Sequence, residues 1–105
     1  MTERITPEEG VIKLESGDTL FVDVRDPASH QEARIPGALL LNQTNLEDFL
    51  AVTDRQQPLV VYCYHGHSSQ GASDYLAEQG FRTVVSLDGG FEHWRQAHPE
   101  HVDSE

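Results

Sequence analysis

Short apolar segments alternate with helix-compatible stretches along this 105-residue chain. The apolar segments are rich in Val and Leu, as buried strands are, and they lie at 20–24, 38–41, 59–63 and 83–87. The helical patterns lie at 7–16, 28–33, 44–50, 69–79 and 91–97. Strands that alternate with helices in this way are typical of a parallel sheet covered on both faces. We therefore expect an α/β fold whose ligand site lies beyond the carboxyl ends of the strands.

Two of the helical patterns begin with a capping signal. Thr6 stands three residues before Glu9, which is the spacing of a capping box, and Thr44 stands three residues before Glu47. In such a box, the hydroxyl at the helix start accepts a backbone N–H bond and the carboxylate accepts one in return. Both threonines are therefore predicted to cap a helix.

The length and charge of the chain limit its organisation and its partners. A chain of this size supports one modest core, so we expect one domain over 1–105, with the core at about 4–98 and a frayed acidic tail at 100–105. No apolar run approaches the roughly 20 residues of a membrane span, and the N-terminus lacks a signal-peptide pattern, which predicts a cytoplasmic protein without a membrane partner. A formal net charge of −11 argues against nucleic-acid binding.

Cys63 is the only cysteine, and it stands where an apolar run meets a polar loop. A single thiol cannot form an internal disulfide, so it suits a reducing compartment. A cysteine at the end of a strand is often an inert core residue, but the residues that follow favour a reactive thiol. They are Tyr64, His65, Gly66, His67, Ser68 and Ser69. Backbone N–H groups of this loop and of the next helix would stabilise a thiolate and lower the pKa of the thiol.

Individual loop residues suggest how the anion would be held. Gly66 is expected to adopt a positive φ that other residues resist, and Ser68 and Ser69 can donate O–H bonds or cap the helix. His65 and His67 are too few to form a metal site, so no metal is expected. If protonated, the two histidines would attract an anion, which would favour activity at mildly acidic pH.

Three segments resemble the rhodanese family, and the resemblance covers nearly the whole chain. Residues 20–26 with 35–38 resemble the N-terminal signature of the family, 63–68 its six-residue active-site loop, and 88–94 its C-terminal signature. The loop is most similar to that of the small stand-alone bacterial thiosulfate sulfurtransferases in the family. The resemblance implies a single rhodanese-like domain in which a central parallel five-stranded sheet carries helices on both faces.

The same resemblance implies a sulfurtransferase reaction without a cofactor. Cys63 would attack the outer sulfur of thiosulfate, release sulfite and hold a persulfide. The sulfur would then pass to a thiophilic acceptor, either cyanide or a thiol, including a protein dithiol such as thioredoxin. Ser68 would place its hydroxyl near the persulfide. Tyr64 and His65 stand where larger members of the family have cationic residues, so thiosulfate would bind weakly.

Supporting residues are expected at the end of an earlier strand. The resemblance places Asp23 and Arg25 beside the active-site loop, where Asp23 either ties two strand-end loops together or takes a direct part in catalysis. Arg34 stands where the family commonly has a histidine before the Ile-Pro-Gly signature. Whether His30 replaces that histidine is left open by the sequence.

Other functions remain as alternatives. A cysteine-dependent phosphatase of the same fold would have an arginine six positions after the cysteine, whereas this chain has Ser69 and lacks the guanidinium that would clamp a phosphoryl group. A non-catalytic rhodanese-like binding module usually lacks the cysteine. A persulfide relay that takes sulfur from another protein is a further alternative. The sequence leaves the physiological donor and acceptor, and the choice between monomer and homodimer, undecided.

Overall fold

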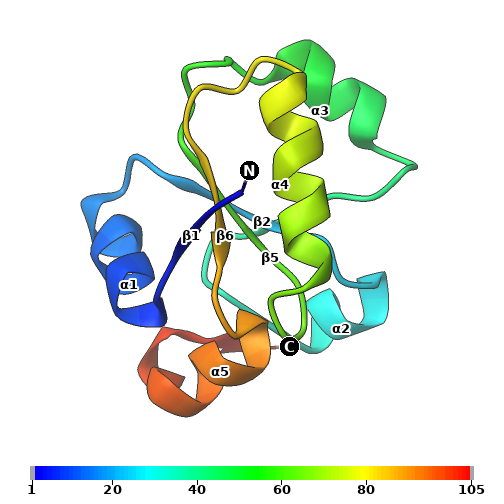
Figure 1. The fold of residues 1–105 in the computed structure, drawn as a ribbon. Helices are drawn as coiled ribbons and strands as arrows, with labels where there is room; N and C mark the ends of the chain where they lie inside the picture. Colours follow the sequence, from blue (N-terminus) through cyan, green and yellow to red (C-terminus); the bar gives the residue numbers. More distant parts are fainter. Residues whose placement is uncertain (1, 105) are drawn as a thin grey trace.

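Five parallel strands form the central sheet in the order β1-β6-β5-β2-β4 (Figure 1). Their bounds are Glu3–Ile5 (β1), Leu20–Asp23 (β2), Leu39–Leu40 (β4), Leu59–Tyr62 (β5) and Val84–Leu87 (β6). The structure is a computed structural model that describes residues 2–104. The expected parallel five-stranded sheet is confirmed. Strand β1 carries no apolar run because only Ile5 is buried in it, so its place at the edge of the sheet was not visible in the pattern.

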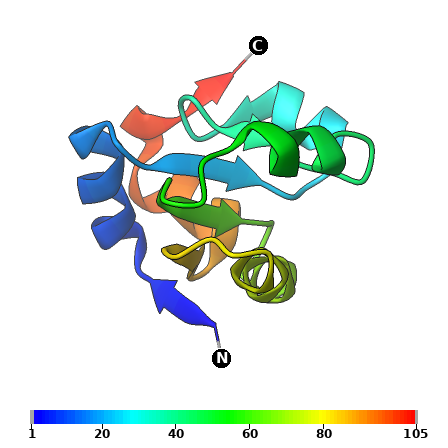
Figure 2. The ribbon, with the colours of Figure 1, turned by 90° about the horizontal axis from the view of Figure 1, so that it is seen from above.

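Helices cover both faces of this sheet, as the sequence predicts. They are Pro7–Ser16 (α1), Pro27–Glu32 (α2), Leu46–Val52 (α3), Ser68–Glu78 (α4) and Gly90–Ala97 (α5). Helices α1 and α5 pack on one face and α3 and α4 on the other; Figure 2 looks almost along the axis of α4 and shows α1 on the opposite side. No helix within residues 2–104 has the length and the apolar composition of a membrane span.

One of the two predicted capping boxes forms and the other does not. Glu9 N–H donates to Thr6 Oγ1 over 3.2 Å and Thr6 N–H donates to Glu9 Oε1 over 2.9 Å, which confirms the first box. The second prediction is wrong, because α3 begins after Asn45 and has no side-chain cap. Two asparagines organise this turn instead: Thr44 N–H donates to Asn42 Oδ1, and Asn42 N–H donates to Asn45 Oδ1. Asparagine side chains compete with helix caps in this way.

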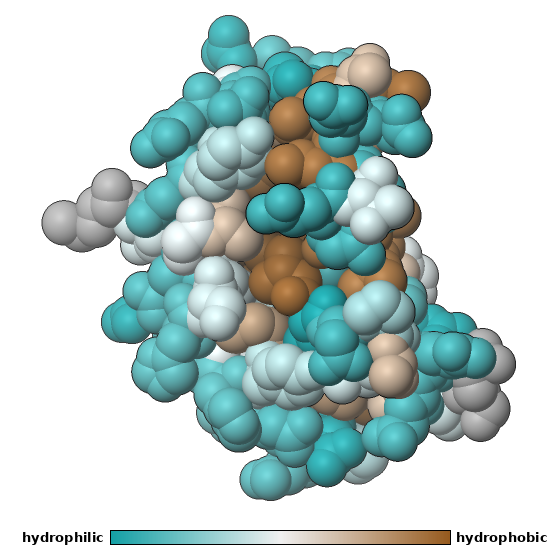
Figure 3. All heavy atoms as spheres, turned by 90° about the vertical axis from the view of Figure 1, so that its right-hand side faces the viewer, coloured by the Kyte–Doolittle hydropathy of each residue, from teal (hydrophilic) through white to brown (hydrophobic). Residues whose placement is uncertain are grey.

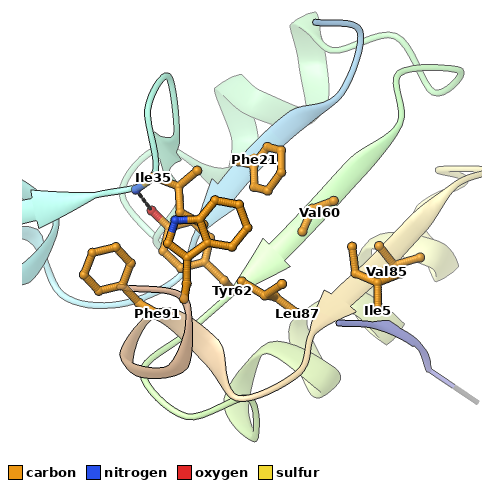
Figure 4. Close-up of a cluster of buried hydrophobic side chains, with 9 residues drawn as sticks. Ile5, Phe21, Ile35, Val60, Tyr62, Val85, Leu87 and Phe91 are labelled. Atoms are coloured by element: carbon orange, nitrogen blue, oxygen red, sulfur yellow. Dashed lines mark hydrogen bonds between the residues drawn. The ribbon is translucent and has the colours of Figure 1, made fainter. Parts of the chain in front are cut away.

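The alternation of side chains along the strands divides the core in two. In β5, Val60 and Tyr62 face the layer of α1 and α5 (Figure 4). In this layer the rings of Phe21 and Trp94 meet edge to face, with 5.9 Å between their centres. The buried hydroxyl of Tyr62 accepts the N–H of Ile35 at 3.2 Å. The opposite core, under α3 and α4, consists of Val22, Leu41, Phe49, Leu59, Val61, Leu76, Phe81 and Val84. Because both faces are buried, the strands read as continuous apolar runs.

The C-terminal segment is ordered rather than frayed in the part that the structure describes. A 3-10 turn at Pro99–His101 is followed by Asp103–Ser104 (β7), which pairs antiparallel with Ala33–Arg34 (β3). The indole N–H of Trp94 donates to the carbonyl of His101 over 2.9 Å. The expectation of a frayed acidic tail is therefore wrong up to residue 104, because the backbone of β7 is paired with that of β3. Residue 105 lies outside the described residues.

Candidate active site

Cys63 directly follows β5, the middle strand of the sheet, and is only 3% exposed. The loop from this cysteine leads into α4, which begins at Ser68. Strand β5 pairs in parallel with β2 on one side and with β6 on the other. The segments after β2 and β6, which carry Arg25 and Asp88, therefore lie at the same edge of the sheet as the thiol. This is the position that the strand pattern predicts for a ligand site.

The sulfur of Cys63 lies among neutral hydrogen-bond donors. The N–H of Gly66 donates to Sγ over 3.2 Å and the N–H of Ser69 over 3.3 Å, while the thiol itself donates to Ser69 Oγ over 3.3 Å. Ser69 belongs to the first turn of α4, where backbone N–H groups lack partners within the helix. The geometry is the one expected for an anion held by the loop and by a helix N-terminus.

These contacts decide the acidity of the thiol. Burial raises the pKa of Cys63, but the hydroxyl of Ser69 and the N–H groups of Ser69, Gly66 and His65 outweigh burial, so the pKa lies below its ordinary value. A lower pKa increases the fraction of thiolate, which is the nucleophilic form. The site is therefore suited to covalent chemistry at sulfur.

Helix α5 holds the outer side of the loop. The N–H of Phe91 donates to the carbonyl of Cys63 over 2.8 Å, and the N–H of Glu92 donates to the carbonyl of Tyr64 over 3.0 Å. Gly90 permits this approach, because a Cβ there would lie 2.5 Å from the Tyr64 carbonyl oxygen. With two loop carbonyls bound to α5, the N–H groups of the loop are free to face the sulfur. The segment at 88–94 thus holds the backbone of the active-site loop in place through these two hydrogen bonds.

Gly66 adopts the backbone conformation that the sequence predicts. Its φ is +92°, and a Cβ at this position would lie 2.9 Å from the backbone nitrogen of Gly89. A side chain would therefore meet both backbone strain and a steric conflict with rigid backbone. Only glycine lets the loop turn its N–H group toward Cys63 here.

The hydroxyl beside the sulfur belongs to Ser69, one residue beyond the expected Ser68. Ser68 is exposed, whereas Ser69 is fully buried. Within residues 2–104, Ser69 supplies the side-chain hydroxyl that contacts Sγ. Ser69 Oγ also lies 2.7 Å from Ser86 Oγ, a residue that the sequence analysis missed. Its only signal is one hydroxyl within an otherwise apolar strand.

Asp23 and Arg25 form a buried ion pair at the end of β2. Arg25 Nη2 lies 2.7 Å from Asp23 Oδ2 and also donates to the carbonyl of Ala33 over 2.6 Å. His30 Nδ1 lies 2.9 Å from the same Asp23 oxygen, so this histidine contacts the ion pair. The described contacts of Asp23 join β2 to α2 and include none to the sulfur, which favours its structural role. Arg34 instead donates to the carbonyl of His30.

Tyr64 is turned away from the sulfur and anchored on α2. Its hydroxyl donates to the carboxylate of Asp26 and lies 2.9 Å from Ser29 Oγ. The bond from Tyr64 is the main reason why the pKa of Asp26 falls to about 2. The Arg25 guanidinium lies 5.8 Å from the centre of the Tyr64 ring. These contacts tie the start of the loop to α2 through the Tyr64 side chain.

The two loop histidines stay on the surface. His65 and His67 are both exposed. Within residues 2–104, no group of three or more His, Cys, Asp or Glu side chains is placed to hold a metal ion. The hydrogen bonds of Sγ are to uncharged groups, namely the N–H groups of Gly66 and Ser69 and the hydroxyl of Ser69. The side chains of the two histidines are not among these partners.

An apolar hollow lies on the face that carries α3 and α4 (Figure 3). Its volume is about 670 Å³, and its lining consists of Val24, Leu41, Asn42, Gln43, Leu46, Glu47, Ala72, Tyr75 and Leu76. Val24 lines the hollow and is also bonded to the strand that leads to the thiol, because its N–H donates to the carbonyl of Tyr62, the residue before Cys63. The thiol itself does not line the hollow, so the reaction centre is the small loop and not the larger space.

Comparison with known proteins agrees with this geometry. Residues 6–97 match the family model of the rhodanese-like domain. A thiosulfate sulfurtransferase GlpE from Stutzerimonas stutzeri (strain A1501) is 48% identical over 101 residues, which cover 96% of this chain and 92% of the relative. A protein of the same name from Pseudomonas savastanoi pv. phaseolicola (strain 1448A / Race 6) is 49% identical over 102 residues, with 95% of each chain covered. A crystal structure of a rhodanese-like domain protein from Staphylococcus aureus has a TM-score of 0.77 at 29% identity, covering 89% of this chain and 91% of that one.

Proposed function

The chain belongs to the family of rhodanese-like domains and is a sulfurtransferase, and we propose that it moves the outer sulfur of thiosulfate to a thiophilic acceptor through a persulfide on Cys63. The observation that carries the proposal is the buried thiol whose sulfur faces the N–H groups of Gly66 and Ser69. These groups stabilise an anion at sulfur without a metal or an organic cofactor.

In the first half-reaction, the Cys63 thiolate attacks the outer sulfur of thiosulfate. A new S–S bond forms to Cys63 while the original S–S bond breaks, and sulfite leaves with its electron pair. The enzyme then holds a persulfide, whose negative charge needs the same donors as the thiolate. Because those donors are fixed by α5 and by α4, they need no reorganisation during the reaction.

In the second half-reaction, a nucleophilic acceptor attacks the outer sulfur of the persulfide. The bond to Cys63 breaks, the thiolate leaves with its electron pair, and the sulfur departs on the acceptor. Cyanide would become thiocyanate and a thiol would become a persulfide. A protein dithiol such as thioredoxin is one acceptor of this class. After each turnover Cys63 must return to the free thiol, the state found here, which suits the reducing cytoplasm.

Two alternatives share the fold and differ in the donor or the reaction. A persulfide relay would use the same loop but accept sulfur from a protein instead of thiosulfate. A non-catalytic binding module has no need of a thiol whose pKa is lowered by surrounding donors. The geometry of the loop favours catalysis over simple binding, and the choice of donor is decided by experiment.

The intact mass of the protein tests the proposal directly. Incubation with thiosulfate should add one sulfur atom per chain, because Cys63 is the only cysteine, and dithiothreitol or cyanide should remove it. The Cys63→Ala variant is the control and should gain no mass. If thiosulfate adds no sulfur while a persulfide on another protein does, the relay alternative replaces the proposal.

A second test separates sulfur transfer from phosphate chemistry. The protein should not hydrolyse a generic aryl phosphate above background, because Ser69 stands where a phosphatase of this fold needs a guanidinium to clamp the phosphoryl oxygens. Release of the aryl alcohol over several turnovers is the measurement, with Cys63→Ala as the control. Multiple turnovers that disappear in the control would contradict the assignment to sulfur.

A further inference from the structure

Ser86 places a hydroxyl where the strand pattern calls for an apolar side chain. In β6, Val85 and Leu87 face the layer of α1 and α5, while Val84 faces the core under α4. Ser86 therefore faces α4, and it is only 1% exposed. A buried hydroxyl costs free energy unless it has a hydrogen-bond partner. The partner that Ser86 has is Ser69 on α4.

The two serines form a line that ends at the sulfur. Ser69 Oγ lies 2.7 Å from Ser86 Oγ and 3.3 Å from Cys63 Sγ. Within residues 2–104, Ser69 Oγ is the one hydrogen-bond partner of the Ser86 hydroxyl, so the Ser86 proton is used only when Ser86 donates to Ser69. Each hydroxyl carries a single proton. The protonated thiol donates to Ser69 Oγ. Once the thiol has lost its proton and Ser69 Oγ accepts from Ser86, the Ser69 proton is directed to the sulfur.

We propose that Ser86 is a positioning residue for Cys63, which acts through Ser69 by directing the Ser69 O–H toward the sulfur. The arrangement favours a sulfur without a proton, either thiolate or persulfide, because such a sulfur can only accept. Hydrogen bonds in a chain polarise one another, so the Ser86 bond strengthens the Ser69 bond to the anion. Ser86 itself does not contact the sulfur in this arrangement.

Another buried serine shows that burial alone does not create this role. Ser73 lies one helical turn after Ser69 on α4 and is also 1% exposed. Its hydroxyl has no hydrogen-bond partner among the described residues. Ser73 is therefore a matched control: a buried serine on the same helix that takes no part in the line of hydroxyls.

Charged groups around the site do not provide the same effect. The titratable side chains on the neighbouring segments include Asp23, Arg25, Asp26, His30, Tyr62, Tyr64, His65, His67, Asp88, Glu92 and His93. Asp23 is paired with Arg25, and Asp88 lies 3.4 Å from Arg4. The pKa of Cys63 is instead set by burial and by the hydrogen bonds of Ser69, Gly66 and His65. A change at Ser86 thus reaches the thiol by way of Ser69.

The test is the pH dependence of Cys63 alkylation by iodoacetamide, which reports one site because the chain has one cysteine. Ser86→Ala should raise the apparent pKa of the thiol by about half a unit to one unit, the size of one hydrogen bond. Ser73→Ala should leave it unchanged, and Ser86→Thr, which keeps the hydroxyl, should restore the wild-type value. Thermal unfolding of each variant checks that the fold is retained. The readout requires no sulfur transfer, so it can fail or succeed independently of the proposed reaction.

The double variant decides whether Ser86 acts through Ser69. Ser69→Ala should raise the thiol pKa by more than Ser86→Ala does, and Ser69→Ala combined with Ser86→Ala should match Ser69→Ala alone. An unchanged pKa in Ser86→Ala would overturn the proposal. A Ser86→Ala shift that persists in full without the Ser69 hydroxyl would overturn it as well.

Discussion

Cys63→Ser is expected to reduce sulfur transfer to background, a loss of at least about 10⁴-fold, as follows removal of a catalytic nucleophile. A serine hydroxyl keeps its proton at neutral pH, and the N–H groups of Gly66 and Ser69 do not lower its pKa enough to change that. The fold should be retained, because serine has nearly the shape of cysteine and the same donors can satisfy its oxygen. Steady-state transfer from thiosulfate to cyanide measures the loss, and thermal unfolding measures the fold.

The control for this variant is Ser73→Ala, which changes a buried residue near the site without touching the sulfur. It should retain wild-type transfer. Transfer that survives in Cys63→Ser would mean that sulfur passes directly from donor to acceptor, because the chain has no second cysteine to carry it. The covalent mechanism would then be wrong.

The strands and helices of the fold were largely predictable because local and global preferences agree in most of them. The Val and Leu runs of β2, β5 and β6 are buried on both faces, so composition alone marks them. Strand β1 was not predicted, because a three-residue edge strand with one buried side chain leaves no periodic signal. The cap of α3 was mispredicted because the choice between Thr44 and the neighbouring asparagines depends on three-dimensional geometry.

The site was predictable to the level of its loop and less so at the level of single contacts. The Cys63 thiol, the turn at Gly66 and the N–H groups of the first helical turn follow from residue types and their order. The choice of Ser69 over Ser68 depends on the rotation of α4, which the sequence does not define within one residue. Ser86 meets Ser69 across 17 positions of the chain, and His30 meets Asp23 across 7. Contacts of this kind arise only when the sheet is assembled.

Gly66→Val is expected to lower sulfur transfer by about 10²- to 10³-fold, the range for loss of one preorganised donor at an anion site. A β-branched residue resists the φ of +92°, and its Cβ would lie 2.9 Å from the backbone nitrogen of Gly89. The loop must shift to relieve this contact, and the N–H of Gly66 then no longer points at Sγ. The apparent pKa of Cys63 should rise for the same reason. Persulfide formation followed by intact mass, together with the alkylation profile, measures both effects.

Backbone strain alone must be separated from damage to the loop, and Gly17 provides the comparison. Gly17 also has a positive φ, +81°, but it ends α1 away from the site and has open space around it. Gly17→Val should therefore destabilise the fold by about 1 to 3 kcal/mol while transfer by the folded protein stays normal. If Gly66→Val transfers sulfur as well as Gly17→Val does, the N–H of Gly66 is not needed to hold the anion. The hydroxyl of Ser69, which contacts Sγ, and the exposed side chains of His65 and His67 would then have to supply that stabilisation.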